Sequence, residues 1–260
     1  MTINNFDSGY YTLKDDEWLK NQRLAGKVLK QAMDEMESAI KPGISTQEVN
    51  DIGEKYILSN NDYIPTFKGY MGFPTAVCIS VNKELVHGIP KADKIINDGD
   101  VVKLDSGVTH KGAIADMART IAVGNIDNKY KMLIEFCKKS LYDSIEYIGK
   151  NIGTIRLGDI GNVIQKSASR INANVIKDLS GHGLEENIPH WAPFIFNYGE
   201  RKTGIKIRPR MTFCIEPMFV YGNDKIKLQD DKWTITTEDI GVHYEHTIFV
   251  HEDHIAIITE

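Results

Sequence analysis

The sequence predicts an α+β fold in which two pseudo-symmetric halves share a central sheet. The first observation is the order of elements, because a pair of helices followed by strands occurs twice along the chain. The second is a weak internal repeat: segments 44–53 and 152–161 agree at five of ten positions, at a constant offset of 108 residues. The two halves are therefore expected to share the same arrangement of helices and strands.

No low-complexity linker divides the two halves. We therefore expect a polar N-terminal arm over residues 1–14 and one domain over residues 15–260. Within that domain, the halves are expected to cover about 15–125 and 126–260.

Helical spacing of apolar residues predicts a first helix from residue 15 to about residue 40, and Lys41-Pro42-Gly43 ends it. Ser45 or Thr46 then caps a second helix that runs to about residue 59. Strands are expected next, at 76–81 and 100–105.

The second half repeats this order. Residues 128–149 and 156–171 carry apolar positions at helical spacing, which predicts two more helices. Alternating apolar residues then predict strands at 211–216, 234–236 and 243–250.

Composition narrows the class of protein. Of the 260 residues, 42% are hydrophobic and 26% are charged, and the net charge of -5 comes without a basic patch, which argues against a nucleic-acid partner. The three cysteines show no disulfide or CxxC pattern. Neither a signal peptide nor an apolar run of about 20 residues is evident. We expect a soluble cytoplasmic protein that does not bind membranes.

Two aspartates are the first candidate site residues. If the segments around Asp105 and Asp116 form a hairpin with His110-Lys111 at its tip, the two aspartates pair directly and share a face. Paired carboxylates repel unless a cation lies between them or they share a proton. An exposed hairpin with two solvated aspartates is the alternative, but apolar neighbours on both strands favour burial.

Further candidates lie in the second half. Glycines flank His182 on both sides, which lets the backbone approach a site closely, and His190 follows eight residues later. Glu216 and Glu245 stand among apolar and aromatic neighbours, where an ionised carboxylate is costly to bury without a partner. Each residue alone has an ordinary structural explanation, such as a loop histidine or a glutamate on a surface strand.

Taken together, the candidates supply four carboxylates and one imidazole. This donor set suits a pair of divalent transition ions such as Mn, Fe, Co or Zn, and two of the carboxylates could bridge the ions. Water held between such ions loses a proton near neutral pH and becomes a nucleophile.

The same residues, in the same order, resemble the type I methionine aminopeptidases of the pita-bread fold. The resemblance rests on Asp105, Asp116, Gly-His182-Gly, Ile-Glu216-Pro and Tyr-Glu245-His-Thr. Further matches are found at 41–46, 77–82 and 87–90, and the likeness runs from about residue 12 to the end. It implies a central antiparallel sheet and a dinuclear metallo-exopeptidase.

By position, the resemblance implies five metal ligands: Asp105, Asp116, His182, Glu216 and Glu245. Asp116 and Glu245 would bridge the two ions, and Glu216 would also shuttle the proton to the leaving amine. His87 and His190 would contact the scissile amide and stabilise the charge that develops on it. The free amino group of the substrate would bind one ion, which restricts cleavage to N-terminal residues.

The resemblance also implies a methionine pocket lined by Tyr70, Phe73, Cys78 and Trp233. An apolar pocket with a polarisable sulfur suits a thioether side chain. Three features depart from the family: residues 184–188 replace a glycine-rich stretch, the interval from His182 to His190 is one residue longer, and Phe73 and Pro189 replace common aromatic residues. We expect these changes to alter the local loop and the substrate preference.

The function expected is removal of the initiator methionine from nascent polypeptides, which a monomeric enzyme could meet at the ribosome. A sibling of the same fold that cleaves beside proline is one alternative, although such enzymes usually carry an additional N-terminal domain. A non-catalytic relative that binds peptides is the other. The presence of all five ligand residues and both accessory histidines argues against it.

Overall fold

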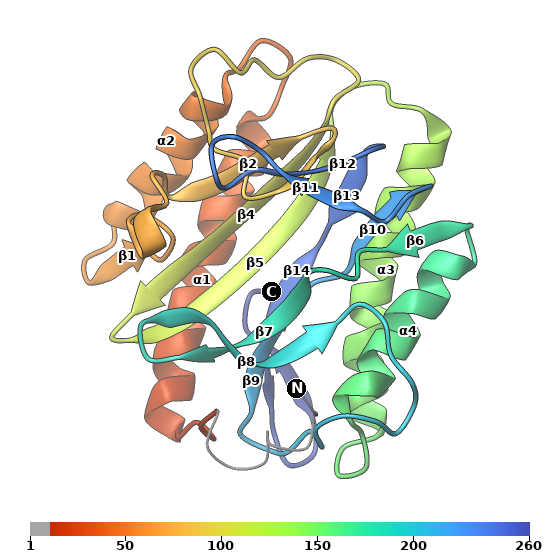
Figure 1. The fold of residues 1–260 in the computed structure, drawn as a ribbon. Helices are drawn as coiled ribbons and strands as arrows, with labels where there is room; N and C mark the ends of the chain where they lie inside the picture. The colour runs from red at the N-terminus through yellow and green to blue at the C-terminus, as the bar shows by residue number, and fades with distance from the viewer. Residues whose placement is uncertain (1–10) are drawn as a thin grey trace.

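The computed structural model describes residues 11–260, in which two helix pairs flank a curled sheet (Figure 1). Helices α1 (Asp16–Ala39) and α2 (Thr46–Leu58) lie on one side of the molecule. Helices α3 (Asn128–Lys150) and α4 (Leu157–Ser169) lie on the other. The four helices follow the sequence-based expectation within a few residues, and the α+β architecture with two pseudo-symmetric halves is confirmed.

All strand pairs of the sheets are antiparallel. The central sheet has the order β1 (Tyr63–Pro65), β4 (Val101–His110), β5 (Ala113–Ala122), β14 (Glu245–Val250), β9 (Thr212–Ile215), β7 (Ser180–Glu185) and β8 (Ile188–Phe196). Two further strands join it, β2 (Val77–Val81) beside β4 and β15 (Ile255–Ile257) beside β14.

Two small sheets and a short 3-10 helix complete the fold. One sheet contains β13 (Gly241–His243), β10 (Met218–Tyr221) and β6 (Ala173–Val175). The other contains β11 (Ile226–Leu228), β12 (Ile235–Thr237) and β3 (Glu84–Val86), and the short helix η2 spans Tyr70–Gly72.

The helix caps show how the two halves correspond. Ser45 caps α2 and forms a reciprocal capping box with Glu48, and the Asp159 side chain likewise accepts from the backbone N–H of Arg156 at the start of α4. Ser45 and Arg156 also form isolated β-bridges, to Ile95 and Lys206. These equivalent positions are 111 residues apart, so the expected offset of 108 is wrong. A shift of three residues nearly restores the helical phase, which explains why the sequences still matched.

Alternation along the central strands separates an apolar face from a polar one. Leu104 and Met117 belong to the core that α1 and α2 cover. Asp105 follows Leu104 on β4, and Asp116 precedes Met117 on β5. Because neighbouring strand residues point to opposite faces, both aspartates face the other side of the sheet. A second core lies under α3 and α4. It includes Phe213 and Ile215 of β9, the strand that ends directly before Glu216. The helices thus leave the opposite face of the sheet free for charged residues.

The register of the β4–β5 hairpin differs from the sequence-based expectation. Asp105 pairs with Ala118 and Asp116 with Gly107, so the two aspartates are diagonal neighbours rather than a direct pair. The reason is the turn, which is Lys111-Gly112 and has positive φ at both residues, as a type I′ turn requires. The shift is two residues, and both carboxylates therefore remain on the same face.

Other elements also differ from expectation. The run predicted as one strand over 243–250 is interrupted at Tyr244, because β13 ends at His243 and turns away to pair with β10. His182 lies within β7 and not in a loop. Its glycines are explained by neighbouring strands, since a Cβ at Gly181 or Gly183 would meet the carbonyl of Cys214 or Ala192 at 2.3 or 2.0 Å.

The expected N-terminal arm lies mostly outside the described residues, which begin at residue 11. Its last part packs against β7, where the buried Lys14 ammonium lies 2.5 Å from Glu185 and Thr12 also donates to that carboxylate. The division into an arm and one catalytic domain over residues 15–260 stays a prediction. Among residues 11–260, we find no helix that combines the length and the apolar character needed to cross a bilayer.

Candidate metal centre

Five predicted ligands converge because their strands are neighbours in the central sheet. Crossing the sheet in the order β4, β5, β14, β9 and β7, the residues met are Asp105, Asp116, Glu245, Glu216 just beyond β9, and His182. All five are buried and line one cavity of about 140 Å³. We refer to these five residues as the ligand cluster.

The donor atoms of the ligand cluster are close together. The Nε2 atom of His182 lies 3.5 Å from Oε1 of Glu216 and 3.7 Å from Oε1 of Glu245. Donor atoms of Asp116, His182 and Glu245 all lie within 4.8 Å of one another. Asp105 lines the same cavity but is not among the residues grouped at that distance.

Several carboxylate oxygens in the ligand cluster lack a hydrogen-bond partner among the described residues. They are Oδ1 of Asp105, both carboxylate oxygens of Asp116 and Oε1 of Glu245. A buried carboxylate that accepts no hydrogen bond is costly unless a proton or a cation compensates its charge. Because the set combines oxygen donors with one imidazole, it fits divalent transition ions.

The pKa values of the carboxyl groups reflect the same cost of burying their charges. Burial raises the pKa of Asp105 to about 6, although the His243 ring opposes this shift. Burial, followed by repulsion from the other carboxylates, raises the pKa of Asp116, Glu216 and Glu245 well above the ordinary range. Without a cation, the ligand cluster therefore holds protons that free carboxyl groups would have lost.

His182 is prepared to act as a ligand through Nε2. Its Nδ1 atom lies 3.2 Å from the Gly183 carbonyl and donates to it in the tautomer that leaves Nε2 unprotonated toward the carboxylates. Burial lowers the pKa of His182 to about 4, so the ring is neutral at physiological pH. A neutral imidazole offers the lone pair that a metal ion requires.

Two residues beside the ligand cluster were missed by the sequence analysis. The Nε2 atom of His243 lies 3.2 Å from Glu216 and 4.0 Å from Glu245, and Cys214 lies within the Asp116–His182–Glu245 group. Each precedes a ligand glutamate by two residues, so strand periodicity could have found both. Burial, then Glu245 and Asp116, raise the pKa of the Cys214 thiol, which therefore stays protonated.

Thr247 fixes the relative position of two ligand strands. Its hydroxyl accepts from the backbone N–H of Asp116 at 2.8 Å and donates to the carbonyl of the same residue at 2.8 Å. Thr247 lies two residues after Glu245 on β14, on the same face of the strand. The backbones that carry Asp116 and Glu245 are thus joined directly through one side chain.

His87 enters the cavity from the loop after β3, with a φ of 58°. The loop is tied to β2, because the N–H of Gly88 donates to the Ser80 hydroxyl at 3.0 Å and the Gly88 carbonyl accepts from Ile79 at 2.8 Å. Burial, and after it the electrostatic effect of the nearby His243 ring, lower the pKa of His87 to about 4. The His87 ring therefore enters the site as a neutral hydrogen-bonding group.

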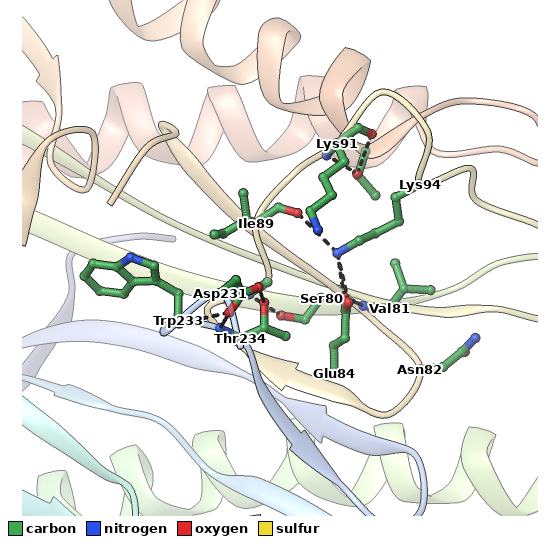
Figure 2. Close-up of polar contacts among 12 residues, drawn as sticks. Ser80, Val81, Asn82, Glu84, Ile89, Lys91, Lys94, Asp231, Trp233 and Thr234 are labelled. Atoms are coloured by element: carbon green, nitrogen blue, oxygen red, sulfur yellow. Dashed lines mark hydrogen bonds and ion pairs between the residues drawn. The ribbon is translucent and has the colours of Figure 1, made fainter. Parts of the chain in front are cut away.

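A second set of bonds holds the rest of that loop (Figure 2). The Lys94 ammonium donates to both oxygens of Glu84 at 2.9 Å and to the carbonyl of Ile89 at 3.2 Å. In the turn between β2 and β3, the carbonyl of Asn82 accepts a hydrogen bond from the buried Lys103 ammonium at 2.7 Å. The backbone on both sides of His87 is consequently well fixed.

His190 approaches from β8 and lies among aromatic rings. Its ring centroid is 4.5 Å from that of His182, 5.7 Å from Tyr70 and 6.1 Å from Phe67. Both accessory histidines line the cavity that contains the ligand cluster. The structure thus brings together all seven residues to which the sequence assigned metal or catalytic roles.

A small apolar cluster adjoins the ligand cluster, since Cys78 on β2 pairs directly with Asp105 on β4. Phe73 and Cys78 form a small core cluster with Phe67, and Trp233 packs against it with its ring centroid 5.1 Å from that of Phe73. Asp231 holds the Trp233 backbone by accepting from its N–H at 3.0 Å (Figure 2).

Three of the four predicted pocket residues therefore meet. The fourth, Tyr70, lies beside His190 instead. Phe67, which the sequence analysis missed, belongs to the apolar cluster and also lines the cavity. No motif marks Phe67 in the sequence.

The segment that departs from the family forms the turn between β7 and β8. The N–H of Asn187, which has a φ of 58°, donates to the Gly112 carbonyl at 3.0 Å, so this turn rests on the tip of the β4–β5 hairpin. Pro189 is buried beside His190 at the start of β8. The changed residues therefore lie in and beside this turn, and the ligand cluster is assembled in their presence.

The raised carboxyl pKa values lead to a prediction about metal binding. Because a metal ion must displace the retained protons, binding of Mn²⁺ or Co²⁺ near pH 7 should release protons, and affinity should weaken as the pH falls toward about 5. Titration calorimetry in buffers of different ionisation enthalpy measures this release. The exposed variant Asp93→Asn serves as a matched control. A binding heat that is independent of buffer, with affinity unchanged by pH, would contradict the account.

Comparison with known proteins places this geometry in a family. Residues 20–252 match the model of "Metallopeptidase family M24". A methionine aminopeptidase from Mycoplasma capricolum is 37% identical over 252 residues, which cover 96% of this chain and 98% of the relative. The solved methionine aminopeptidase of Thermotoga maritima is 34% identical, with a TM-score of 0.92 over 96% of this chain and 99% of that one.

A more distant neighbour shares the fold only. The prolidase of Pyrococcus furiosus is 20% identical and superposes with a TM-score of 0.74, covering 95% of this chain but 65% of the prolidase. The family match and the near full-length likeness to methionine aminopeptidases agree with the buried set of ligands described above. The chain therefore belongs to metallopeptidase family M24 and, within it, to the methionine aminopeptidase group.

Proposed function

We propose that this protein is a metal-dependent hydrolase that removes the initiator methionine from newly made proteins. The observation that carries the proposal is the convergence of four buried carboxylates and His182 on one cavity beside a cluster of apolar side chains. Relatives that match nearly the whole chain are named methionine aminopeptidases, which supports the same reaction here.

The ligand cluster would hold two divalent ions, drawn from Mn, Fe, Co or Zn. Asp116 and Glu245 occupy adjacent central strands and approach both His182 and the other carboxylates, which supports the prediction that these two side chains are shared between the ions. When bound, such a pair lowers the pKa of a water molecule between the ions and polarises the scissile carbonyl.

Glu216 is proposed to move the proton during hydrolysis. Burial, followed by the charge of Asp105, raises the pKa of Glu216 well above the ordinary range, which favours uptake of a proton by this carboxylate. The Glu216 carboxylate would accept the proton of the attacking water and return it to the leaving amine. The Nε2 atom of His243 lies 3.2 Å from Oε2 of Glu216, whereas Oε1 of Glu216 is the oxygen nearer to His182.

His87 and His190 are proposed to contact the scissile amide. Because its pKa is lowered to about 4, the His87 ring is neutral and donates a hydrogen bond without adding a full charge to the site. His87 reaches the cavity from the loop after β3 and His190 from β8, so the substrate carbonyl would lie between donors from two elements. Fixed donors of this kind stabilise the negative charge that develops in the transition state.

The apolar pocket formed by Phe73, Cys78, Trp233 and Phe67 is proposed to select methionine, with Tyr70 at its rim beside His190. Its lining of aromatic rings and one sulfur suits the thioether of a methionine side chain. Because an initiator methionine is present only on newly made chains, we also propose that the protein acts in the cytoplasm, as a monomer that meets nascent chains near the ribosome.

The direct test is peptide hydrolysis by protein from which metal has been removed and to which Mn, Fe, Co or Zn is then returned. We expect metal-dependent release of methionine from Met-Ala-Ser and no cleavage of Xaa-Pro peptides. Cleavage of only the Xaa-Pro peptides would instead assign the protein to proline-specific hydrolysis. If two ions bind and no peptide is cleaved, a binding role replaces catalysis.

His87→Ala separates a catalytic role from a metal-binding one. Removing one donor to the developing charge should lower kcat by about 100-fold to 1000-fold while the metal content stays at the wild-type level. Steady-state kinetics with Met-Ala-Ser and elemental analysis of the same sample measure both quantities. Loss of metal in this variant would show that His87 is a ligand and that its assigned role is wrong.

A further inference from the structure

A row of exposed aromatic side chains runs along β8 and just beyond it. Trp191, Phe194, Phe196 and Tyr198 expose 41%, 47%, 45% and 39% of their surface. They are four of the twelve large apolar residues exposed within residues 11–260, yet they fall in a stretch of eight residues. Exposed apolar residues gathered in this way mark an interaction surface rather than chance exposure. We refer to these four residues as the aromatic row.

Three members of the aromatic row, Phe194, Phe196 and Tyr198, line a groove of about 520 Å³. Its other wall comes from the start of α4 and from the loop that follows Tyr198, namely Leu157, Gly158, Thr203, Gly204 and Ile205. Helix α4 packs tightly on the back of β8, since a Cβ at Gly161 would meet the carbonyl of Tyr198 at 2.2 Å. Because the backbone is fixed from behind, the aromatic rings stay turned outward.

The aromatic row begins at the reaction site. Phe194 pairs directly with the ligand His182, and Phe196 pairs with Ser180, which lines the same cavity as His182. Directly opposed residues on antiparallel strands share a face, with Cβ atoms about 5 Å apart. His190, the proposed contact of the scissile amide, precedes Trp191 on the same strand. The groove is therefore a continuation of the site along β8.

We infer that the aromatic row binds the substrate polypeptide beyond its first two residues and favours apolar side chains there. From His190 to Phe196 the strand spans about 20 Å at roughly 3.3 Å per residue, a length that an extended peptide covers in about six residues. The third to about the seventh residue of the substrate would therefore lie in the groove. The inference rests on the proposed function for its substrate.

The substrate chain is the occupant that the geometry favours. Under the proposed function, the first residue of the substrate lies in the cavity, so the remaining chain must leave the cavity along one of its walls. The β8 wall leads from the cavity to the groove, because Phe194 and Phe196 line the groove and lie directly opposite His182 and Ser180, which line the cavity. A second copy of this chain on the same surface is the competing occupant that the test must distinguish.

The test compares peptides of different length and composition. One peptide is Met-Ala-Ser, whose third and last residue reaches only the start of the groove, and two are nine residues long, with Leu or Ser at the fifth to seventh positions. For the wild type, we expect kcat/KM to be about ten-fold higher for the Leu peptide than for the Ser peptide. In Phe194→Ser and Phe196→Ser, that ratio should fall to near one. Leu58→Ser, an equally exposed change on α2, should preserve the ratio.

Each failure has a distinct reading. If Met-Ala-Ser is cleaved but the wild type does not distinguish the two long peptides, the inference is wrong while the proposed function stands. The same holds if the ratio survives in both phenylalanine variants. If no methionine peptide is cleaved, the proposed function fails. Sedimentation that shows a concentration-dependent dimer in the wild type, lost in Phe196→Ser, would assign the row to a second copy and overturn the inference.

Discussion

The mutual repulsion of four buried carboxylates is the constraint on which the rest of this structure depends. Asp105, Asp116, Glu216 and Glu245 line one small cavity, and several of their oxygens accept no hydrogen bond from the described residues. Each ionised group buried in this way costs several kcal/mol unless a counter-charge is present. The two hydrophobic cores under the helix pairs supply the stability that keeps such an arrangement folded.

The groups around the ligand cluster are consistent with a cation as the counter-charge. If the histidines were the counter-charge, they would have to be protonated, but burial lowers the pKa of His182, His87 and His243 to about 4. No lysine or arginine lines the cavity among the described residues. Neutral imidazoles beside excess carboxylates are the arrangement expected of a site that takes up metal ions and then uses nearby uncharged donors for catalysis.

Local chemistry explains what the sequence could predict. The four helices follow from apolar spacing and from caps such as Ser45 with Glu48, and the ligand residues follow from costly residue types in apolar settings. The register of β4 and β5 could not be derived with certainty, because it depends on whether His110 or Gly112 takes a positive φ. Cys214 and His243 could have been found from their place two residues before Glu216 and Glu245, whereas Phe67 becomes part of the site only through long-range packing, which no single motif encodes.

Metal stoichiometry tests the central claim most directly. Protein freed of metal, reconstituted with Mn²⁺ or Co²⁺ and passed through a desalting column, should retain two ions per chain by elemental analysis. Asp116→Ala should retain at most one, because a carboxylate shared by both ions is gone, whereas the exposed variant Asp98→Ala should retain two. Two ions in Asp116→Ala, or none in the wild type, would contradict the account.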